Sequence, residues 1–141
     1  MELSRFTDYS LRTLIYAGIH SGKTITVSEV ATAYGISENH LVKITHNLGK
    51  LGFLETKRGR SGGFQLSRSP EEINIGAVVR ATETLALVEC LGTDGGSCPI
   101  VHACVLKRVI AEARDAFLET FDRYVLSDLL RTKVLLLESL K

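Results

Sequence analysis

The sequence predicts a mostly α-helical protein with a small β-hairpin, arranged as a winged helix-turn-helix domain followed by a long helix. Two short helical segments separated by a glycine turn predict the helix-turn-helix. A basic, glycine-rich hairpin follows and predicts the wing. An amphipathic stretch of about 20 residues nearer the C-terminus predicts the long helix.

The first two helices are predicted from ordinary start and stop signals. Apolar residues recur at helical spacing over 6–19, and Ser21-Gly22 ends the pattern. Thr26 and Glu29 have the spacing of a capping box, in which hydroxyl and carboxylate satisfy backbone amides at a helix start. A second, short helix is therefore expected over about 26–34.

A third helix is expected directly after a left-handed turn at Gly35. Ser37 can cap this helix, which should run over 38–51 and end at Gly52. Its buried stripe is expected to consist of Ile36, Leu41, Ile44, Leu48 and Leu51. The two short helices and their turn have the size of a helix-turn-helix.

The next segment has the pattern of a hairpin. Residues 53–58 alternate like a strand, 59–63 form a glycine-rich turn, and 64–66 return. A helix-turn-helix with a basic hairpin behind it is a winged helix.

The second half of the chain is predicted to be helical on either side of a loop. A short helix is expected over 75–82 and a long one over 102–123. The apolar positions of the long helix are Val105, Leu106, Val109, Ile110, Ala113, Ala116, Phe117 and Phe121. This stripe needs a partner surface, which a second copy in a two-fold dimer supplies, although packing on its own domain is an alternative. A last apolar segment over 126–140, with Ser127 as a possible cap, is expected to fold back over the long helix.

Length and composition indicate one ordinary globular domain with room for an oligomerisation extension. The chain has 141 residues, of which 45% are hydrophobic, so a real core can form. It shows neither a signal peptide pattern nor a run of 18 apolar residues, and we expect a cytoplasmic protein. Lys and Arg outnumber Asp and Glu by 9 to 5 over 1–70, whereas they number 8 against 11 over 71–141. The first half is thus about +4, which suits an anionic partner, although chance fluctuation is the alternative.

All the cysteines of the chain, Cys90, Cys98 and Cys104, lie within 15 residues. Three glycines between the first two allow the tight wrapping that converging thiolates need. The segment therefore resembles a ligand set for a metal ion or an iron-sulfur cluster. Three thiolates leave a tetrahedral metal or a cubane cluster one ligand short.

Two other interpretations of the cysteines compete. They could be small buried hydrophobic residues, but the polar, glycine-rich loop is unsuited to a core. A structural zinc site completed by His102 is the stronger rival. Zinc ligands usually come in pairs two to four residues apart, whereas 7 and 5 residues separate these cysteines. Iron-sulfur coordination tolerates such spacing better.

The winged-helix pattern also predicts where DNA would be contacted. In such folds the start of the third helix lies in the major groove. The candidates there are Ser37, Asn39, His40 and Lys43. In the wing, the candidates for a minor-groove or phosphate contact are Lys57, Arg58 and Arg60. A merely solvated helix face is the alternative.

Several motifs together resemble a known family. These are the opening Leu3-Ser4-Arg5-Phe6-Thr7-Asp8-Tyr9-Ser10-Leu11-Arg12, the Gly35-Ile36-Ser37 turn with Leu41-Val42-Lys43, the Arg58-Gly59-Arg60-Ser61-Gly62-Gly63 wing and the cysteine triad. They resemble the iron-sulfur winged-helix regulators, which include the nitric oxide-sensing NsrR type and IscR. The resemblance covers essentially the whole chain. Phe6-Thr7-Asp8-Tyr9 and Leu14-Ile15-Tyr16 are more similar to the NsrR type.

This resemblance implies a homodimeric repressor that binds double-stranded promoter DNA and releases it when nitric oxide nitrosylates its cluster. It implies a cluster, 4Fe-4S or alternatively 2Fe-2S, held by the three cysteines. It also implies an oxygen ligand from the N-terminal helix of the partner subunit, and Asp8 stands at the matching position. Helix capping, or interaction with the helix dipole, is the other explanation of Asp8. His102 is the competing ligand.

The expected organisation is a DNA-binding winged helix over 1–83, a cluster-binding loop over 84–104, and a dimerisation helix with a C-terminal helix over 105–141. No enzyme activity is expected, because the sequence has no Ser-His-Asp order, Walker loop or paired-carboxylate pattern. Two other functions use the same residues. One is an IscR-like regulator of iron-sulfur cluster supply, and the other, from a different class, is a small iron-sulfur electron carrier.

Overall fold

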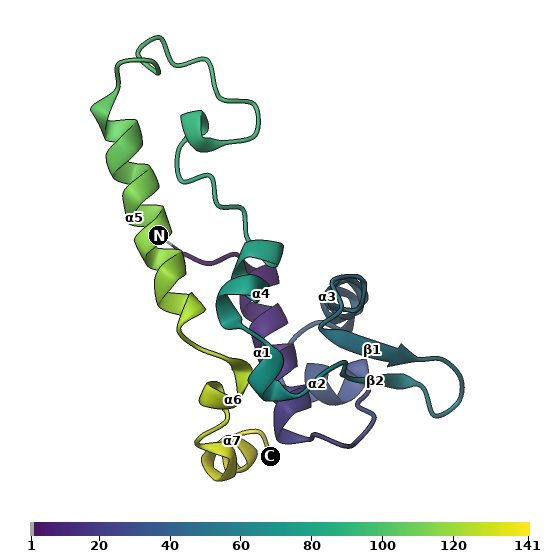
Figure 1. Ribbon diagram of the computed structural model, residues 1–141. Coiled ribbons are helices and arrows are strands. Elements are labelled where there is room, and N and C mark those ends of the chain that lie inside the picture. Colours follow the sequence, from purple (N-terminus) through teal and green to yellow (C-terminus); the bar gives the residue numbers. More distant parts are fainter. Residues whose placement is uncertain (1) are drawn as a thin grey trace.

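The computed structural model describes residues 2–141, so that Met1, at the start of the expected winged-helix domain, lies outside it. Its helices are α1 (Arg5–Ile19), α2 (Val27–Tyr34), α3 (Glu38–Lys50), α4 (Ile75–Thr82), α5 (Val105–Asp122), α6 (Leu126–Leu129) and α7 (Lys133–Ser139). Its strands are β1 (Leu54–Lys57) and β2 (Gly63–Leu66), and its 3-10 turns are Pro70–Glu72 and Glu89–Leu91. The predicted fold class is confirmed. Figure 1 shows the hairpin and an arm, made of α5 and the loop before it, projecting from the helical body.

The helix-turn-helix forms through the predicted local signals. Thr26 and Glu29 make the capping box at the start of α2, and hydrogen bonds from Thr26 hold the pKa of Glu29 below its usual value. Gly35 ends α2 with a φ of 64°, which glycine adopts without steric cost. Ser37 occupies the N-cap position of α3, as expected, but its side chain makes no capping bond within residues 2–141. The expected burial of Leu51 was wrong, because Leu51 follows the last helical turn and is 38% exposed.

The wing is anchored to the body through its second strand. β1 and β2 pair antiparallel, with Leu54 opposite Leu66 and Lys57 opposite Gly63. Ile25, which precedes α2, exchanges two backbone hydrogen bonds of 2.8 Å with Phe64 of β2. Phe64 is 2% exposed. The hairpin is therefore positioned by backbone bonds and by one buried aromatic ring.

One core joins the winged helix to the C-terminal helices. Its members include Leu14 of α1, Leu48 of α3, Val79 of α4, Leu118 of α5 and Leu126 of α6. Leu118 lies near the C-terminal end of α5, so this end of the helix packs in the shared core. The N-terminal end of α5, which follows the cysteine loop, extends away from this core (Figure 1).

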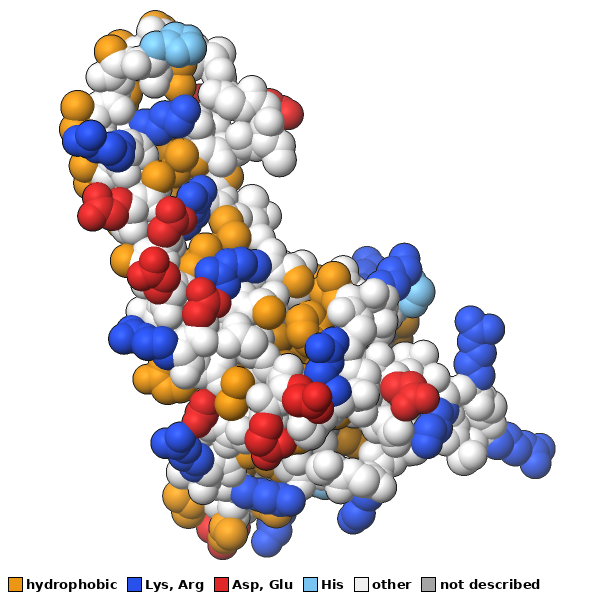
Figure 2. Space-filling view, viewed as in Figure 1, with side chains coloured by type: hydrophobic (Ala, Val, Ile, Leu, Met, Phe, Trp, Pro, Cys, Tyr) orange, Lys and Arg blue, Asp and Glu red, His pale blue; other side chains and the backbone are white. Residues whose placement is uncertain are grey.

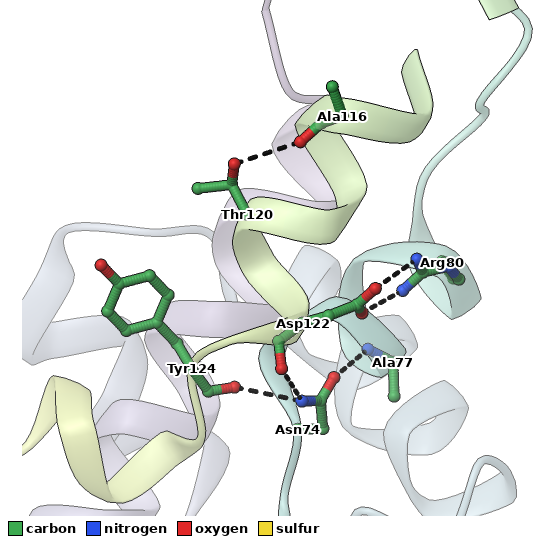
Figure 3. A network of polar contacts seen from close by, with 7 residues as sticks. All are labelled: Asn74, Ala77, Arg80, Ala116, Thr120, Asp122 and Tyr124. Atoms are coloured by element: carbon green, nitrogen blue, oxygen red, sulfur yellow. Dashed lines mark hydrogen bonds and ion pairs between the residues drawn. The ribbon is translucent and has the colours of Figure 1, made fainter. Parts of the chain in front are cut away.

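A polar network fixes the end of α5 against the start of α4 (Figure 3). Asn74 caps α4 by accepting from the Ala77 amide, and its own amide group donates to the carbonyl of Asp122 at 2.8 Å. Arg80 and Asp122 form a bidentate ion pair, whose second contact measures 2.7 Å. This pair raises the pKa of Arg80 and lowers that of Asp122.

The C-terminal third departs from the expected arrangement. The long helix begins at Val105, not near 102, because residues 98–103 close into turns, with Val101 bonding back to Cys98. The last segment packs on α1, not over α5. Leu130 can approach α1 at Gly18, where an added Cβ would lie 2.6 Å from Leu130 Cδ1. Ser127 lies inside α6 and is not its cap.

Within residues 2–141, the helices are too short or too polar to cross a lipid bilayer.

Candidate functional site

The outer face of α3 presents the predicted polar residues to solvent. Asn39, His40 and Lys43 are exposed, as is Ser37 just before the helix. The neighbouring Leu41 and Ile44 are at most 1% exposed, as expected for inward positions. The local pattern thus separates a core face from a face that a double helix could meet.

His40 stands apart from the other three, because it leans toward α1. Its ring centroid lies 6.4 Å from that of Tyr9. A cavity of about 120 Å³ opens beside the pair, lined by Arg5, Phe6, Tyr9, His40, Lys43 and Ile44. The N-terminal part of α3 is thereby in contact with the start of α1, the helix that carries Asp8.

Further exposed residues lie on the same face of α3. These residues, absent from the predicted contact set, are Val42, His46 and Lys50. Spacing of three and four residues along the helix from Asn39 and Lys43 is the signal that would have found them.

The wing carries its charge at its tip. Lys57 Nζ donates to Gln65 Oε1 at 3.4 Å, and Gln65 Nε2 donates to Glu55 Oε2 at 3.1 Å. This ladder satisfies part of the Lys57 hydrogen-bonding capacity. Arg58 and Arg60 are exposed in the turn beyond the strands, and Figure 2 shows basic side chains extending from the hairpin into solvent.

The three cysteines lie in and next to the loop between α4 and α5. Cys90 belongs to a 3-10 turn, Cys98 to the loop, and Cys104 immediately precedes α5. All three thiols are partly exposed and none forms a disulfide. The loop folds back on Glu89, whose carboxylate accepts from the Ser97 amide at 3.0 Å, and Gly95 and Gly96 adopt positive φ there.

Asp8 is held by its own helix. It forms two contacts with Arg12, of 2.8 and 3.1 Å. Ser4, not Asp8, caps α1, because the Ser4 hydroxyl accepts from the Thr7 amide. His102 is exposed in the turns before α5. Within the single chain over residues 2–141, no three Cys, His, Asp or Glu side chains are gathered closely enough to hold a metal ion.

Glu83 connects the start of α1 with the start of the cysteine loop. Its carboxylate accepts from the Ser4 amide at 2.7 Å and from the Thr84 amide at 3.0 Å. Burial alone would raise the pKa of Glu83, but these hydrogen bonds outweigh it and keep the pKa low. The helix that carries Asp8 and the loop that carries the cysteines are therefore tied together by one carboxylate.

Comparison with known proteins gives a consistent result. The model of the Rrf2 family, an iron-dependent transcriptional regulator, matches residues 3–132. An HTH-type transcriptional regulator NsrR from Halalkalibacterium halodurans is 50% identical over 132 residues, which are 92% of this chain and 90% of the relative. The protein of the same name from Geobacillus kaustophilus is 45% identical over 143 residues, covering 100% of this chain and 97% of the relative.

Solved structures agree with this. The structure of T. potens IscR has a TM-score of 0.74 and 25% sequence identity, and the match covers 94% of this chain and 88% of that one.

Proposed function

Because the chain belongs to the Rrf2 family of transcriptional regulators, we propose that it is an iron-sulfur-dependent repressor that senses nitric oxide. One observation carries this proposal: the exposed polar face of α3 and the basic wing accompany a loop with three thiols, none of them in a disulfide. An electron carrier would need the thiols but neither the wing nor the exposed helix face.

DNA binding follows from the arrangement of α3 and the wing. A helix of this kind enters the major groove, where Asn39 can pair with a base edge and Lys43 with a phosphate. The exposed Arg58 and Arg60 suit the neighbouring phosphates or the minor groove. Base contacts give sequence preference, and the wing gives salt-dependent affinity.

Replacing Arg58 with alanine should weaken DNA binding without favouring particular sequences, because a phosphate contact reads no base. The slope of log affinity against log salt concentration should fall by about 0.9 for each phosphate that the protein no longer neutralises. Fluorescence anisotropy over a salt series measures this. Lys133→Ala is the matched control, since Lys133 is also an exposed cation and lies on α7, away from the wing. Equal slopes for Arg58→Ala and the unmodified protein would remove Arg58 from the interface.

The exposed apolar face of the α5 arm supports the proposal of a dimer. Val105, Leu106 and Val109 on α5 are 62%, 62% and 52% exposed, and Figure 2 shows hydrophobic side chains on the surface of this arm. A stripe of this kind on a soluble protein is usually covered by a partner. A second copy is the partner we infer, because it would also place two α3 helices for a palindromic site.

The three thiols of the cysteine loop are the donor groups that iron-sulfur clusters use. Cys90, Cys98 and Cys104 would hold the cluster, 4Fe-4S or alternatively 2Fe-2S, through their thiolates. Within residues 2–141 the single chain does not gather three such side chains closely enough for a metal ion, so we infer that the loop closes around the cluster and that a residue other than these cysteines completes the ligand set. When bound, the cluster supplies iron that nitric oxide can attack.

We propose Asp8 of the partner subunit as that fourth ligand. The Asp8 carboxylate has more lone pairs than Arg12 occupies, so the ion pair can orient the carboxylate without blocking it. A carboxylate is a harder ligand than a thiolate, and the iron it holds should be the more labile. Through Ser4 and Glu83, a change at the start of α1 also reaches the base of the loop.

Replacing Asp8 with alanine should accelerate loss of the cluster in air by at least about tenfold, because changes even beyond the direct ligands weaken metal sites by that much. Absorbance at the cluster band follows the loss. His102→Ala should leave the rate unchanged, and Arg12→Ala, which keeps the carboxylate, should have an intermediate rate. The reverse order, with His102→Ala the labile variant, would transfer the role to His102.

Mössbauer spectroscopy of anaerobic protein, with metal analysis, tests the cofactor itself. We expect iron and sulfide in cluster stoichiometry, and bound zinc with no iron would contradict the proposal. DNA binding by cluster-free protein as tight as that of the loaded form would favour an IscR-like monitor of cluster supply.

A further inference from the structure

Val42 is an apolar residue placed in the polar, outward face of α3. Its side chain is 54% exposed, whereas the inward Leu41, Ile44 and Leu48 are at most 1% exposed. Val42 is therefore not part of the core, and a role in core packing does not explain why a valine stands at this position. Nor does helix stability, because a β-branched residue is a weaker helix former than the straight-chain residues that usually occupy an exposed helical position.

The neighbours of Val42 are those of a DNA-facing position. Asn39 precedes it by three residues and His46 follows it by four, so all three share one side of the helix. Thr45, which is 7% exposed, uses its hydroxyl internally, donating to the carbonyls of Leu41 at 2.9 Å and Val42 at 3.1 Å. Because Thr45 is buried, it offers no surface to a ligand. The exposed methyl groups of Val42 are therefore the apolar surface that this part of α3 presents to solvent.

The charges around Val42 indicate what covers it. Lys43 and Lys50 are exposed on α3, and Arg58 and Arg60 are exposed on the adjacent wing. A purely apolar protein partner would have to bury these cations without compensation, whereas a duplex supplies phosphates for them. The major groove also presents one apolar group, the C5 methyl of thymine.

We propose that Val42 is a specificity-determining residue that recognises a thymine through contact with its C5 methyl group. This inference rests on the proposed DNA-binding function and deepens it. Asn39 and Lys43 can pair with base edges or phosphates by hydrogen bonding, and Val42 adds a contact that only thymine can satisfy. A cytosine at the same position lacks the methyl group and would leave Val42 against bare ring carbon.

Deoxyuridine substitution tests this contact, because it removes the methyl group and keeps the base pair. Anaerobically purified full-length protein first selects its binding site from a random duplex library. Each thymine of the selected site is then replaced singly by deoxyuridine, and affinity is measured by anisotropy. One thymine in each half-site should lose about fourfold on replacement, the cost of one buried methyl group. Val42→Ala changes both subunits of the dimer, so on the thymine duplex it should lose about fourfold per half-site, roughly 16-fold in all. It should lose nothing further when that thymine is replaced by deoxyuridine.

Two controls keep the result interpretable. Val134→Ala removes an equally apolar, 69% exposed side chain on α7 and should keep the full response to deoxyuridine. Val42→Thr keeps the branched shape with one methyl group and should respond between wild type and Val42→Ala. Equal deoxyuridine responses in wild type and Val42→Ala at every thymine would overturn the inference. If wild-type protein enriched no sequence at all, the proposed function itself would fail, and this inference with it.

Discussion

Replacing Cys104 with alanine is expected to abolish cluster binding and to weaken specific DNA binding about 5- to 150-fold, the usual range for coupling between two sites. Cys104 is one of three thiolates in an already incomplete set, so its loss leaves too few ligands for a stable cluster. The fold should survive. Cys104 makes no side-chain capping bond to the described part of α5, and it is partly exposed, so alanine leaves no large cavity.

Iron and sulfide analysis, circular dichroism and anisotropy on one preparation separate these effects. Thr93→Ala, an exposed non-ligand change in the same loop, should keep the cluster and the DNA affinity. Full iron content in Cys104→Ala would exclude this thiolate as a ligand. Loss of the cluster with unchanged DNA affinity would break the proposed link between the loop and α3.

Replacing Gly63 with alanine should destabilise the protein by about 1–3 kcal/mol, the usual cost of overpacking. A Cβ there would collide with the carbonyl oxygen of Ile25 and lie 2.9 Å from its carbonyl carbon and from Thr24 Cγ2. Because two of these three atoms are backbone, the strand must move, and the bonds between Ile25 and Phe64 must weaken. DNA affinity should fall as well, since the wing loses its anchor.

Gly49→Ala is the matched control for this prediction. Its added Cβ would lie 3.6 Å from Thr56 Cγ2, which is ordinary van der Waals contact. Alanine is favoured over glycine by up to roughly 0.5–1 kcal/mol in a helix, and by less than that at Gly49, the next-to-last residue of α3. Chemical denaturation should therefore show opposite shifts for the two variants. A Gly63→Ala protein as stable as wild type would show that the wing tolerates displacement from Ile25.

The parts of the fold that depend on local signals could be predicted from the sequence. The capping box of Thr26 and Glu29 and the left-handed turn at Gly35 require only neighbouring residues, and both form as expected. The C-terminal segment depends on distant contacts. Its packing on α1 requires Gly18, more than a hundred residues before Leu130, to leave room for that side chain. Apolar periodicity over 126–140 indicates a buried face but not which helix buries it.

The candidate site also has features that local sequence predicts and features that depend on the folded structure. Exposure of Asn39 and Lys43 followed from helical spacing. Val42 was missed because an apolar residue in a helix is ordinarily assigned to the core, although its spacing from Asn39 places it on the exposed face that the structure shows. The contact of Glu83 with Ser4 also lay beyond sequence reasoning, because the two partners are 79 positions apart in the sequence. Whether Asp8 reaches the cysteines of a second chain remains a prediction from family resemblance.

The most direct test of the central claim is the affinity of the anaerobic, cluster-loaded protein for its selected duplex during a nitric oxide titration. The account predicts tight binding at the start and a decrease of about 5- to 150-fold that follows the decline of cluster absorbance. Affinity that stays constant while the cluster absorbance disappears would contradict it.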